Sequence, residues 1–383
     1  IPLTCQIRGN TMTKTSGHID WFILLSVVGL MLFSVAFVYS ASSSFSMVKF
    51  GSSEKLFWNH ALRVLIGLVA IILFARIDYH HWEKFTTPIL ILAFCCLIYV
   101  LVSGARINGA ARWIHFGFIN FQPSEFVKFA LVLHISALAA AAKDYISDFR
   151  TGMLPLLLWI VIGCGLVAAQ PNLSTASVIF LITAIIMFVA NAPLKKLSLI
   201  AAGGFVLAAI YAVSAPYRLK RILAFTGYGK GTTSEVVNYQ LQQAILAFGN
   251  GGIFGVGPGQ SLQRDFFLPE SYGDFVFAVV GEEYGFIGVL LILTAFGIIL
   301  WRGINVAKKA PDLFGRLLAV GITVTLALYA FINAGVTCGI LPTTGLPMPF
   351  ISYGGSSVFF SAAAVGTLLN ISAQAGVYPN KTK

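Results

Sequence analysis

Apolar segments recur along the whole chain, and each is about long enough to cross a lipid bilayer. A transmembrane helix needs roughly 17–25 mostly apolar residues, because the hydrocarbon core is about 30 Å thick. The chain is 57% hydrophobic and only 10% charged, so it has too few charges to coat a water-facing surface of its size. We therefore predict an all-α polytopic membrane protein. The ten predicted transmembrane helices lie at about 19–41, 56–76, 86–103, 123–142, 152–169, 172–190, 196–215, 273–301, 313–337 and 349–373.

These segments divide the chain into three parts. Residues 1–18 are predicted to form a cytoplasmic N-terminal segment, and we expect its first ten residues to be vector-derived or to reflect an upstream start. Residues 19–373 form a single ten-helix membrane domain, with a large extracytoplasmic loop, 216–272, between the seventh and eighth helices. Residues 374–383 form a cytoplasmic C-terminal tail.

The positive charges predict the orientation. Fourteen Lys and Arg residues fall in the termini and one set of alternate connections, whereas the short connections of the other set hold four, namely Lys49, Lys55, Arg106 and Arg112. Cytoplasmic connections carry the excess of Lys and Arg, so both termini are predicted to be cytoplasmic. The same excess explains most of the net charge of +11, and no basic cluster with interleaved aromatic residues indicates a nucleic-acid partner.

The long outer loop departs from this charge rule. It carries Arg218, Arg221 and further cations on the predicted outer side. Cations that face outward suit an anionic ligand such as a phosphate. Within the loop, Leu241, Ile245 and Phe248 are spaced as on one helix face, which predicts an amphipathic helix at the membrane interface. The glycine-rich stretch after it lacks the context of a nucleotide-binding loop, and we expect it to approach a substrate.

Four carboxylates lie in or at the edge of apolar helices, where each needs a partner or a wet cavity. Asp274 lies at the outer mouth of the eighth helix, where it can either cap the helix or act as a general base. Glu282 and Glu283 are expected to join helices through buried hydrogen bonds. Glu125 and Lys128 are three residues apart on one helix face, so a structural ion pair is the simplest interpretation.

Seven motifs together resemble the SEDS family (shape, elongation, division and sporulation) of membrane proteins, over about residues 19–372. The motifs occur in the family's order: VYSASS (38–43), NGAARWI (108–114), FQPSEFVK (121–128), PYRLKR (216–221), NYQLQQA with GGIFGVGPGQS, LPESYGDFVFAVVGEE (268–283) and LPTTGLPMPFISYGGSS (341–357). The resemblance covers nearly the whole chain, and we interpret it as slightly closer to the FtsW than to the RodA type.

The resemblance implies a peptidoglycan glycosyltransferase in the bacterial plasma membrane that polymerises lipid II at the outer face, with an extracytoplasmic active site. Asp274 occupies the position of the family's essential Asp and would act as the general base, with undecaprenyl diphosphate as the leaving group. The implied substrate- and diphosphate-binding residues are Arg112, Trp113, Glu125, Lys128, Arg218, Arg221, Gln260 and Ser261. A divalent cation, Mg²⁺ or Mn²⁺, is implied as cofactor. The implied partners are lipid II, the lipid-linked glycan, a cognate class B penicillin-binding protein that supplies the transpeptidase, and other divisome or elongasome proteins.

One departure from the family affects the metal. Family members often carry an Asp after Gln-Pro at the start of the sixth helix, where this chain has Asn172. An amide adds no formal charge to a metal site. The metal ligands are therefore unknown from the sequence.

Two other classes of function remain open. A lipid II flippase could use the same cavity and acids to move the head group across the bilayer. A non-catalytic scaffold could recruit a division or elongation partner. The enzyme is favoured because the carboxylates crowd towards the outer half and the outer loop carries unexplained cations.

Overall fold

The structure is a computed structural model that describes residues 17–103, 106–107, 110–116, 119–214, 219, 232–268 and 272–375. Nine helices within these residues are long and apolar enough to cross a membrane. They are α1 (Trp21–Phe50), α2 (Lys55–Arg76), α3 (Tyr79–Ser103), α4 (Pro123–Ala141), α5 (Leu154–Ala169, continuous with the π-helical turn Phe149–Met153), α7 (Leu194–Val213), α11 (Val276–Lys309), α12 (Leu313–Thr337) and α13 (Gly355–Gln374). The apolar helix α6 (Leu173–Val189) has 17 residues.

The prediction of a mostly helical membrane protein is therefore confirmed, and each predicted segment contains one of these helices. The count of ten transmembrane helices stays a prediction, because α6 is shorter than the nine others counted as spans. The predicted outer loop, 216–272, contains α9 (Thr232–Gly251) and α10 (Leu262–Phe266).

Two details of the sequence prediction were wrong. The last predicted helix starts too early, because residues 349–354 are irregular and α13 begins at Gly355. Phe350 in this stretch has a φ of 64°, a left-handed conformation that no helix continues through. The connection before α4 also folds as two antiparallel hairpins, β1 (Arg106–Ile107) with β2 (Ala110–Ala111) and β3 (Ile114–Phe116) with β4 (Ile119–Phe121).

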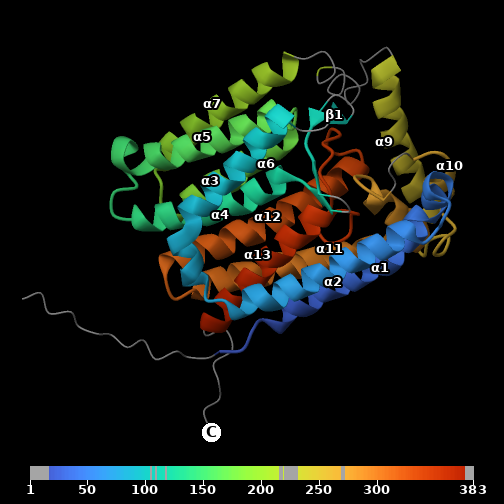
Figure 1. Cartoon of the computed structure of the whole chain (residues 1–383), viewed down its shortest axis with the longest axis horizontal. Coiled ribbons are helices and arrows are strands. Elements are labelled where there is room, and N and C mark those ends of the chain that lie inside the picture. The colour runs from blue at the N-terminus through green and yellow to red at the C-terminus, as the bar shows by residue number, and fades with distance from the viewer. Residues whose placement is uncertain are drawn as a thin grey trace, which may run out of the picture.

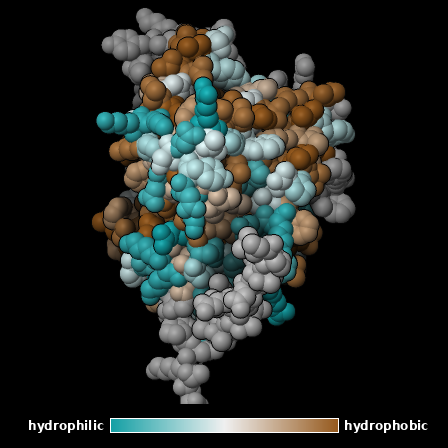
Figure 2. Space-filling model, turned by 90° about the vertical axis from the view of Figure 1, so that its left-hand side faces the viewer, coloured by the Kyte–Doolittle hydropathy of each residue, from teal (hydrophilic) through white to brown (hydrophobic). Residues whose placement is uncertain are grey.

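The apolar helices run roughly along one direction, so the bundle has two ends, and α9 runs across that direction at one of them (Figure 1). The connections α2–α3, α4–α5 and α11–α12 gather at one end, together with both ends of the described chain. There the Gly17 N–H donates to the Ala373 carbonyl at 3.1 Å. Figure 2 shows hydrophilic side chains over this end and hydrophobic side chains along the flanks. A polar end with apolar flanks is the surface that a multi-pass membrane protein presents.

The core lies around α4, α12 and α13. In their most apolar windows these helices are 72%, 67% and 78% buried, whereas α7 is only 6% buried. A helix that is hydrophobic all round and exposed within the protein suits a lipid environment. The central helices α4, α12 and α13 therefore carry the packing that positions the outer connections.

Glu282 and Glu283 fasten the outer loop to α11, as predicted. Both carboxylates are buried. Glu282 accepts hydrogen bonds from the Ser261 hydroxyl, the Asn250 amide at 3.2 Å and the Gln263 N–H at 3.3 Å. Glu283 accepts hydrogen bonds from the Ser40 hydroxyl of α1 at 2.7 Å and from Arg264 at 3.2 Å. These two residues join α1, α9, α10 and α11 at the end of the bundle opposite the described chain ends.

The predicted amphipathic helix exists as α9, and it packs mainly along α11. Phe248 lies against Phe277 with ring centroids 5.9 Å apart. Ala244 and Ala247 are buried, whereas Ile245 is 48% exposed. The helix thus packs against the bundle through a face of small residues. Only part of the predicted apolar stripe faces the bundle.

A kink at Gly285 in α11 makes room for the loop after α9. Gly285 has φ 63° and ψ −163°, a region essentially restricted to glycine. A Cβ atom there would lie 2.4 Å from the Gly255 backbone nitrogen and 2.5 Å from the Ile253 carbonyl oxygen. The glycine therefore allows the backbone of the loop to pass directly over α11.

We expect Gly285→Ala to lower the free energy of unfolding by about 1–3 kcal/mol, from backbone strain and the clash with the loop. The matched control is Gly297→Ala in the same helix, where a Cβ meets nothing within 4 Å. That substitution should be neutral or stabilise by up to about 1 kcal/mol. Denaturation in detergent measures both changes, and equal stabilities would contradict this role of Gly285.

Candidate active site

The irregular segment after α12 is fastened to the start of α11, at the end of the bundle opposite the described chain ends. The Asn333 amide of α12 donates to the Asp274 carbonyl and to the Leu346 carbonyl, both at 2.8 Å. The Ser352 hydroxyl donates to the Gly273 carbonyl at 2.9 Å, and the Tyr353 N–H donates to the Tyr272 carbonyl at 2.9 Å. Segments about 70 residues apart in the chain are thereby held as one framework.

Asp274 lies within this framework and is half-buried. Its carboxylate faces Gly345, where a Cβ would come within 3.2 Å of Asp274 Oδ2. The N-cap of α11 is Phe275, so Asp274 is one residue before the cap position. The capping role and the general-base role of Asp274 both stay predictions. Asp274 is a partly accessible carboxylate on an ordered backbone, at the mouth of the bundle.

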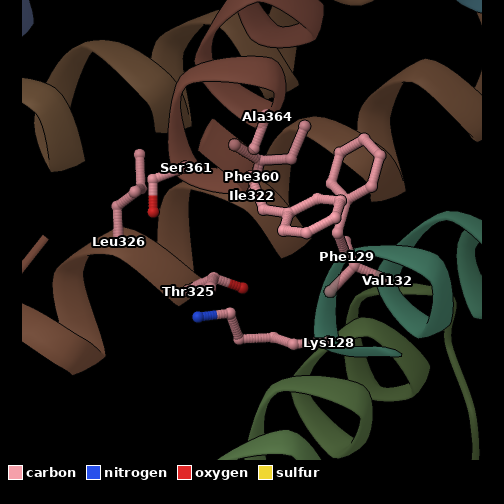
Figure 3. Close-up of a pocket in the computed structure, with 9 residues that line it drawn as sticks. All are labelled: Lys128, Phe129, Val132, Ile322, Thr325, Leu326, Phe360, Ser361 and Ala364. Carbon is pink, nitrogen blue, oxygen red and sulfur yellow. The ribbon is translucent and has the colours of Figure 1, made fainter. Parts of the chain in front are cut away.

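The predicted ion pair between Glu125 and Lys128 is present. Lys128 Nζ lies 2.7 Å from Glu125 Oε2, and the two side chains are only 7% and 2% exposed. The same ammonium lies 3.8 Å from the centroid of the Tyr329 ring of α12. Lys128 also lines a small, mostly apolar cavity between α4, α12 and α13, and its side chain runs towards Thr325 (Figure 3).

Arg112 and Trp113 lie half-buried between the two hairpins. Arg112 Nε donates to the Gln170 carbonyl at 3.2 Å, and its Nη2 donates to the Pro171 carbonyl. The guanidinium thus caps the junction between α5 and α6. Asn172, where relatives often have Asp, is the N-cap of α6, and its side chain accepts a hydrogen bond from the Thr175 N–H at 3.4 Å.

The outer-loop candidates have different surroundings. Gln260 is exposed. Ser261 is buried, caps α10 and donates its hydroxyl to Glu282. Arg218 and Arg221 lie outside the described residues. Substrate roles for all eight binding candidates stay predictions, and the structure brings Glu125 and Lys128 into direct contact.

Sequence reasoning left one charged residue of the apolar segments without a role. Arg63 lies within α2, and its guanidinium carbon is 4.5 Å from the centroid of the Tyr353 ring. Tyr353 in turn contacts Tyr272, two residues before Asp274, with ring centroids 5.6 Å apart. A charge inside an apolar segment was the available signal, because such residues mark functional sites by default.

We expect Asn333→Ala to reduce turnover by about 10- to 100-fold, because the backbone that carries Asp274 loses a cross-link and small misplacements are costly in catalysis. Losing two buried hydrogen bonds should lower the stability by about 1–3 kcal/mol. Thr337→Val is the matched control, since its hydroxyl bonds only within α12, to Asn333 and Ala334 carbonyls. Steady-state kinetics on both variants check this, and an equal loss of turnover would contradict a specific role for Asn333.

The fit of a divalent cation depends on Asp274. Within the described residues, no group of three or more His, Cys, Asp or Glu side chains could hold a metal ion. Mg²⁺ is nevertheless often bound by one or two carboxylates together with substrate phosphates. A partly exposed single carboxylate such as Asp274 fits that mode and does not fit a metal held by protein ligands alone.

The fold and this site define a polytopic helical membrane protein with an ordered carboxylate at one end of its bundle. Residues 20–376 match the model of the family described as "Cell cycle protein", the FtsW/RodA/SpoVE family. The chain belongs to this family, and the resemblance inferred from the motifs is confirmed.

Individual relatives align with this chain over nearly their whole length. The chain is 39% identical to the probable peptidoglycan glycosyltransferase FtsW of Trichlorobacter lovleyi, over 92% of this chain and 93% of the relative. It is 38% identical to the stage V sporulation protein E of Bacillus subtilis, over 94% of this chain and 98% of the relative.

Two solved structures have a similar fold. A chain from a peptidoglycan synthase complex, described as coordinating polymerisation and crosslinking, gives a TM-score of 0.76 at 27% identity, covering 94% of this chain and 99% of that chain. The rod shape determining protein RodA of Thermus thermophilus gives a TM-score of 0.68 at 26% identity, covering 92% and 96%. The chain is therefore a multi-pass bacterial membrane protein with a RodA-like fold.

Proposed function

We propose that this protein is a peptidoglycan glycosyltransferase that polymerises lipid II at the outer face of the plasma membrane. The observation that carries the proposal is Asp274. It is a partly accessible carboxylate whose backbone is fixed by Asn333 and whose side chain faces Gly345. The relatives named as peptidoglycan glycosyltransferases support the same activity.

In this proposal Asp274 acts as the general base. It accepts the proton of the sugar 4-hydroxyl of one substrate as that oxygen attacks the anomeric carbon of the other. A glycosidic bond forms, the bond from the anomeric carbon to the diphosphate oxygen breaks, and undecaprenyl diphosphate leaves with the electron pair. Glycine at position 345 leaves space beside the carboxylate for the sugar.

The leaving diphosphate gains negative charge, which fixed positive groups stabilise. Arg112 at the outer hairpins, Lys128 at the cavity between α4, α12 and α13, and the loop residues Arg218 and Arg221 are the proposed cations. A divalent cation held by Asp274 and the diphosphate would supply further neutralisation of charge. The ion pair with Glu125 keeps Lys128 charged within a buried setting.

A class B penicillin-binding protein is the proposed partner, because the related solved structure belongs to a complex that couples polymerisation to crosslinking. Both termini are proposed to be cytoplasmic and Asp274 extracytoplasmic. The positive connections at the end that carries both described chain ends support this orientation.

A lipid II flippase is the alternative, and proteoliposomes separate the two. Fluorescent lipid II is supplied to vesicles that contain the protein and its partner, and both polymer formation and transfer between leaflets are measured. Polymer without transfer supports the enzyme. Transfer without polymer would replace it with the flippase.

A further inference from the structure

We propose that Arg63 of α2 is a further substrate-binding residue, and that its guanidinium binds the diphosphate of a membrane-anchored polyprenyl substrate. The inference rests on the proposed function, and it adds a substrate-binding residue that the sequence motifs did not identify. Arg63 lies eight residues after the start of α2, or about 12 Å along the helix. An arginine at that depth in an apolar helix is costly unless it has a partner.

Arg63 is half-buried and, unlike the other cations enclosed by the bundle, has no acidic partner among the described residues. Lys128 pairs with Glu125, Arg264 with Glu283, and Arg302 with Asp20. Among the described residues, Arg63 has no carboxylate within 4.0 Å and forms no hydrogen bond, and its charge contacts only the Tyr353 ring. A planar cation stacked on an aromatic face keeps its fork of N–H donors free, which suits bidentate binding of phosphate oxygens.

The surroundings of Arg63 favour an anion. A Cβ at Gly355 would lie 3.3 Å from Arg63 Nε, so the guanidinium sits at the first residue of α13. The N-cap of α13, Gly354, provides no side-chain hydrogen bond, so the positive end of that helix adds to the charge of the arginine. His60, one turn before Arg63, is buried and stacks near Tyr353, and its Nδ1 has no hydrogen-bond partner among the described residues.

The position of Arg63 connects it to Asp274. The rings of Tyr353 and Tyr272 are in contact, and their backbones are hydrogen-bonded at 2.9 Å. These contacts extend to the residue before Asp274, because the Ser352 hydroxyl donates to the Gly273 carbonyl. Arg63 can therefore hold the diphosphate deeper along the bundle while the sugar reaches the carboxylate. The polyprenyl chain would then remain in the lipid beside α2.

The test is a titration of the purified full-length protein in nanodiscs with undecaprenyl diphosphate. We expect Arg63→Gln to raise the dissociation constant by at least about tenfold. Arg63→Lys should recover part of the affinity, because the positive charge remains but the forked N–H donors of the guanidinium are lost. Lys55→Gln is the matched control. Lys55 lies on the same helix as Arg63, and its ammonium lies over a different ring, 4.5 Å from the centroid of Phe50. The Lys55→Gln variant should bind undecaprenyl diphosphate with unchanged affinity.

Further measurements keep the result interpretable. Melting temperatures establish that each variant is folded, and Tyr353→Leu tests the ring separately, with an expected loss of affinity smaller than that of Arg63→Gln. Phosphatidylglycerol is titrated in parallel, to distinguish a general lipid headgroup from a diphosphate. Equal binding of undecaprenyl diphosphate by wild type and Arg63→Gln, or an equal loss for phosphatidylglycerol, would overturn the inference.

These outcomes are separate from the proposed function. Arg63-dependent binding by a protein that forms no glycan would leave this inference standing and remove the polymerase. Glycan formation with an unchanged KM in Arg63→Gln would support the polymerase and remove the proposed role of Arg63.

Discussion

Replacement of Asp274 by Asn should abolish glycan polymerisation, with a loss of at least about 100-fold in kcat. General-base catalysis contributes roughly 10²–10⁴-fold, and the amide of Asn cannot accept the proton of the attacking hydroxyl. Asn has nearly the same size, so the contact with Gly345 and the hydrogen bond from Asn333 to the Asp274 carbonyl are retained. The melting temperature and the affinity for lipid II should therefore change little.

The matched control for this variant is Glu54→Gln, which removes an exposed carboxylate at the start of α2, on the predicted outer side. Single-turnover polymerisation of fluorescent lipid II measures the chemical step in both variants. Full activity of a folded Asp274→Asn protein would remove Asp274 from the mechanism. A parallel loss in Glu54→Gln would point to charge at the outer face rather than to a base.

Replacement of Lys128 by Met should destabilise the protein by about 3–5 kcal/mol, the largest stability effect that we expect. The pair is buried, with Lys128 7% and Glu125 2% exposed, so removal of one partner leaves an uncompensated charge in the core. The variant also loses the contact of the ammonium with the Tyr329 ring. Chemical denaturation in detergent measures the loss.

A double variant separates charge from packing. Glu125→Gln with Lys128→Met removes both charges and keeps similar volumes, so most of the lost stability should return. A double variant as unstable as Lys128→Met would contradict the ion-pair explanation. If the stable double variant also fails to polymerise lipid II, the pair serves the proposed diphosphate site in addition to the fold.

The sequence predicted the helices well because the bilayer imposes one length and one composition on every span. Most predicted boundaries lie within about three residues of a helix end, but α1 continues to Phe50, α3 begins at Tyr79 and α11 continues to Lys309. Residues 349–354 are apolar enough to count as helix, yet left-handed residues such as Phe350 make them irregular. The hairpins at 106–121 were missed because strands of two or three residues have no readable alternation.

Contacts of the candidate site were predictable where a charged residue in an apolar segment had few possible partners. Glu125 with Lys128 follows from spacing on one helix. The partners of Glu283 and of the Asp274 backbone could not be predicted, because Ser40 and Asn333 reach them from distant parts of the chain. The bond from Ser352 to the neighbouring Gly273 carbonyl is equally distant in sequence. Arg63 was recognisable as a charge within an apolar segment, but its place beside Tyr353 depends on the packing of α2 against α13.

The most direct test of the account is glycan-chain formation from fluorescent lipid II by the purified protein with its penicillin-binding partner. A penicillin-type inhibitor blocks crosslinking, and a moenomycin-type inhibitor blocks unrelated glycosyltransferases. The account predicts moenomycin-resistant polymer from the wild-type protein and none from the folded Asp274→Asn variant. No polymer from the wild-type protein, with a partner shown to be active in crosslinking, would contradict it.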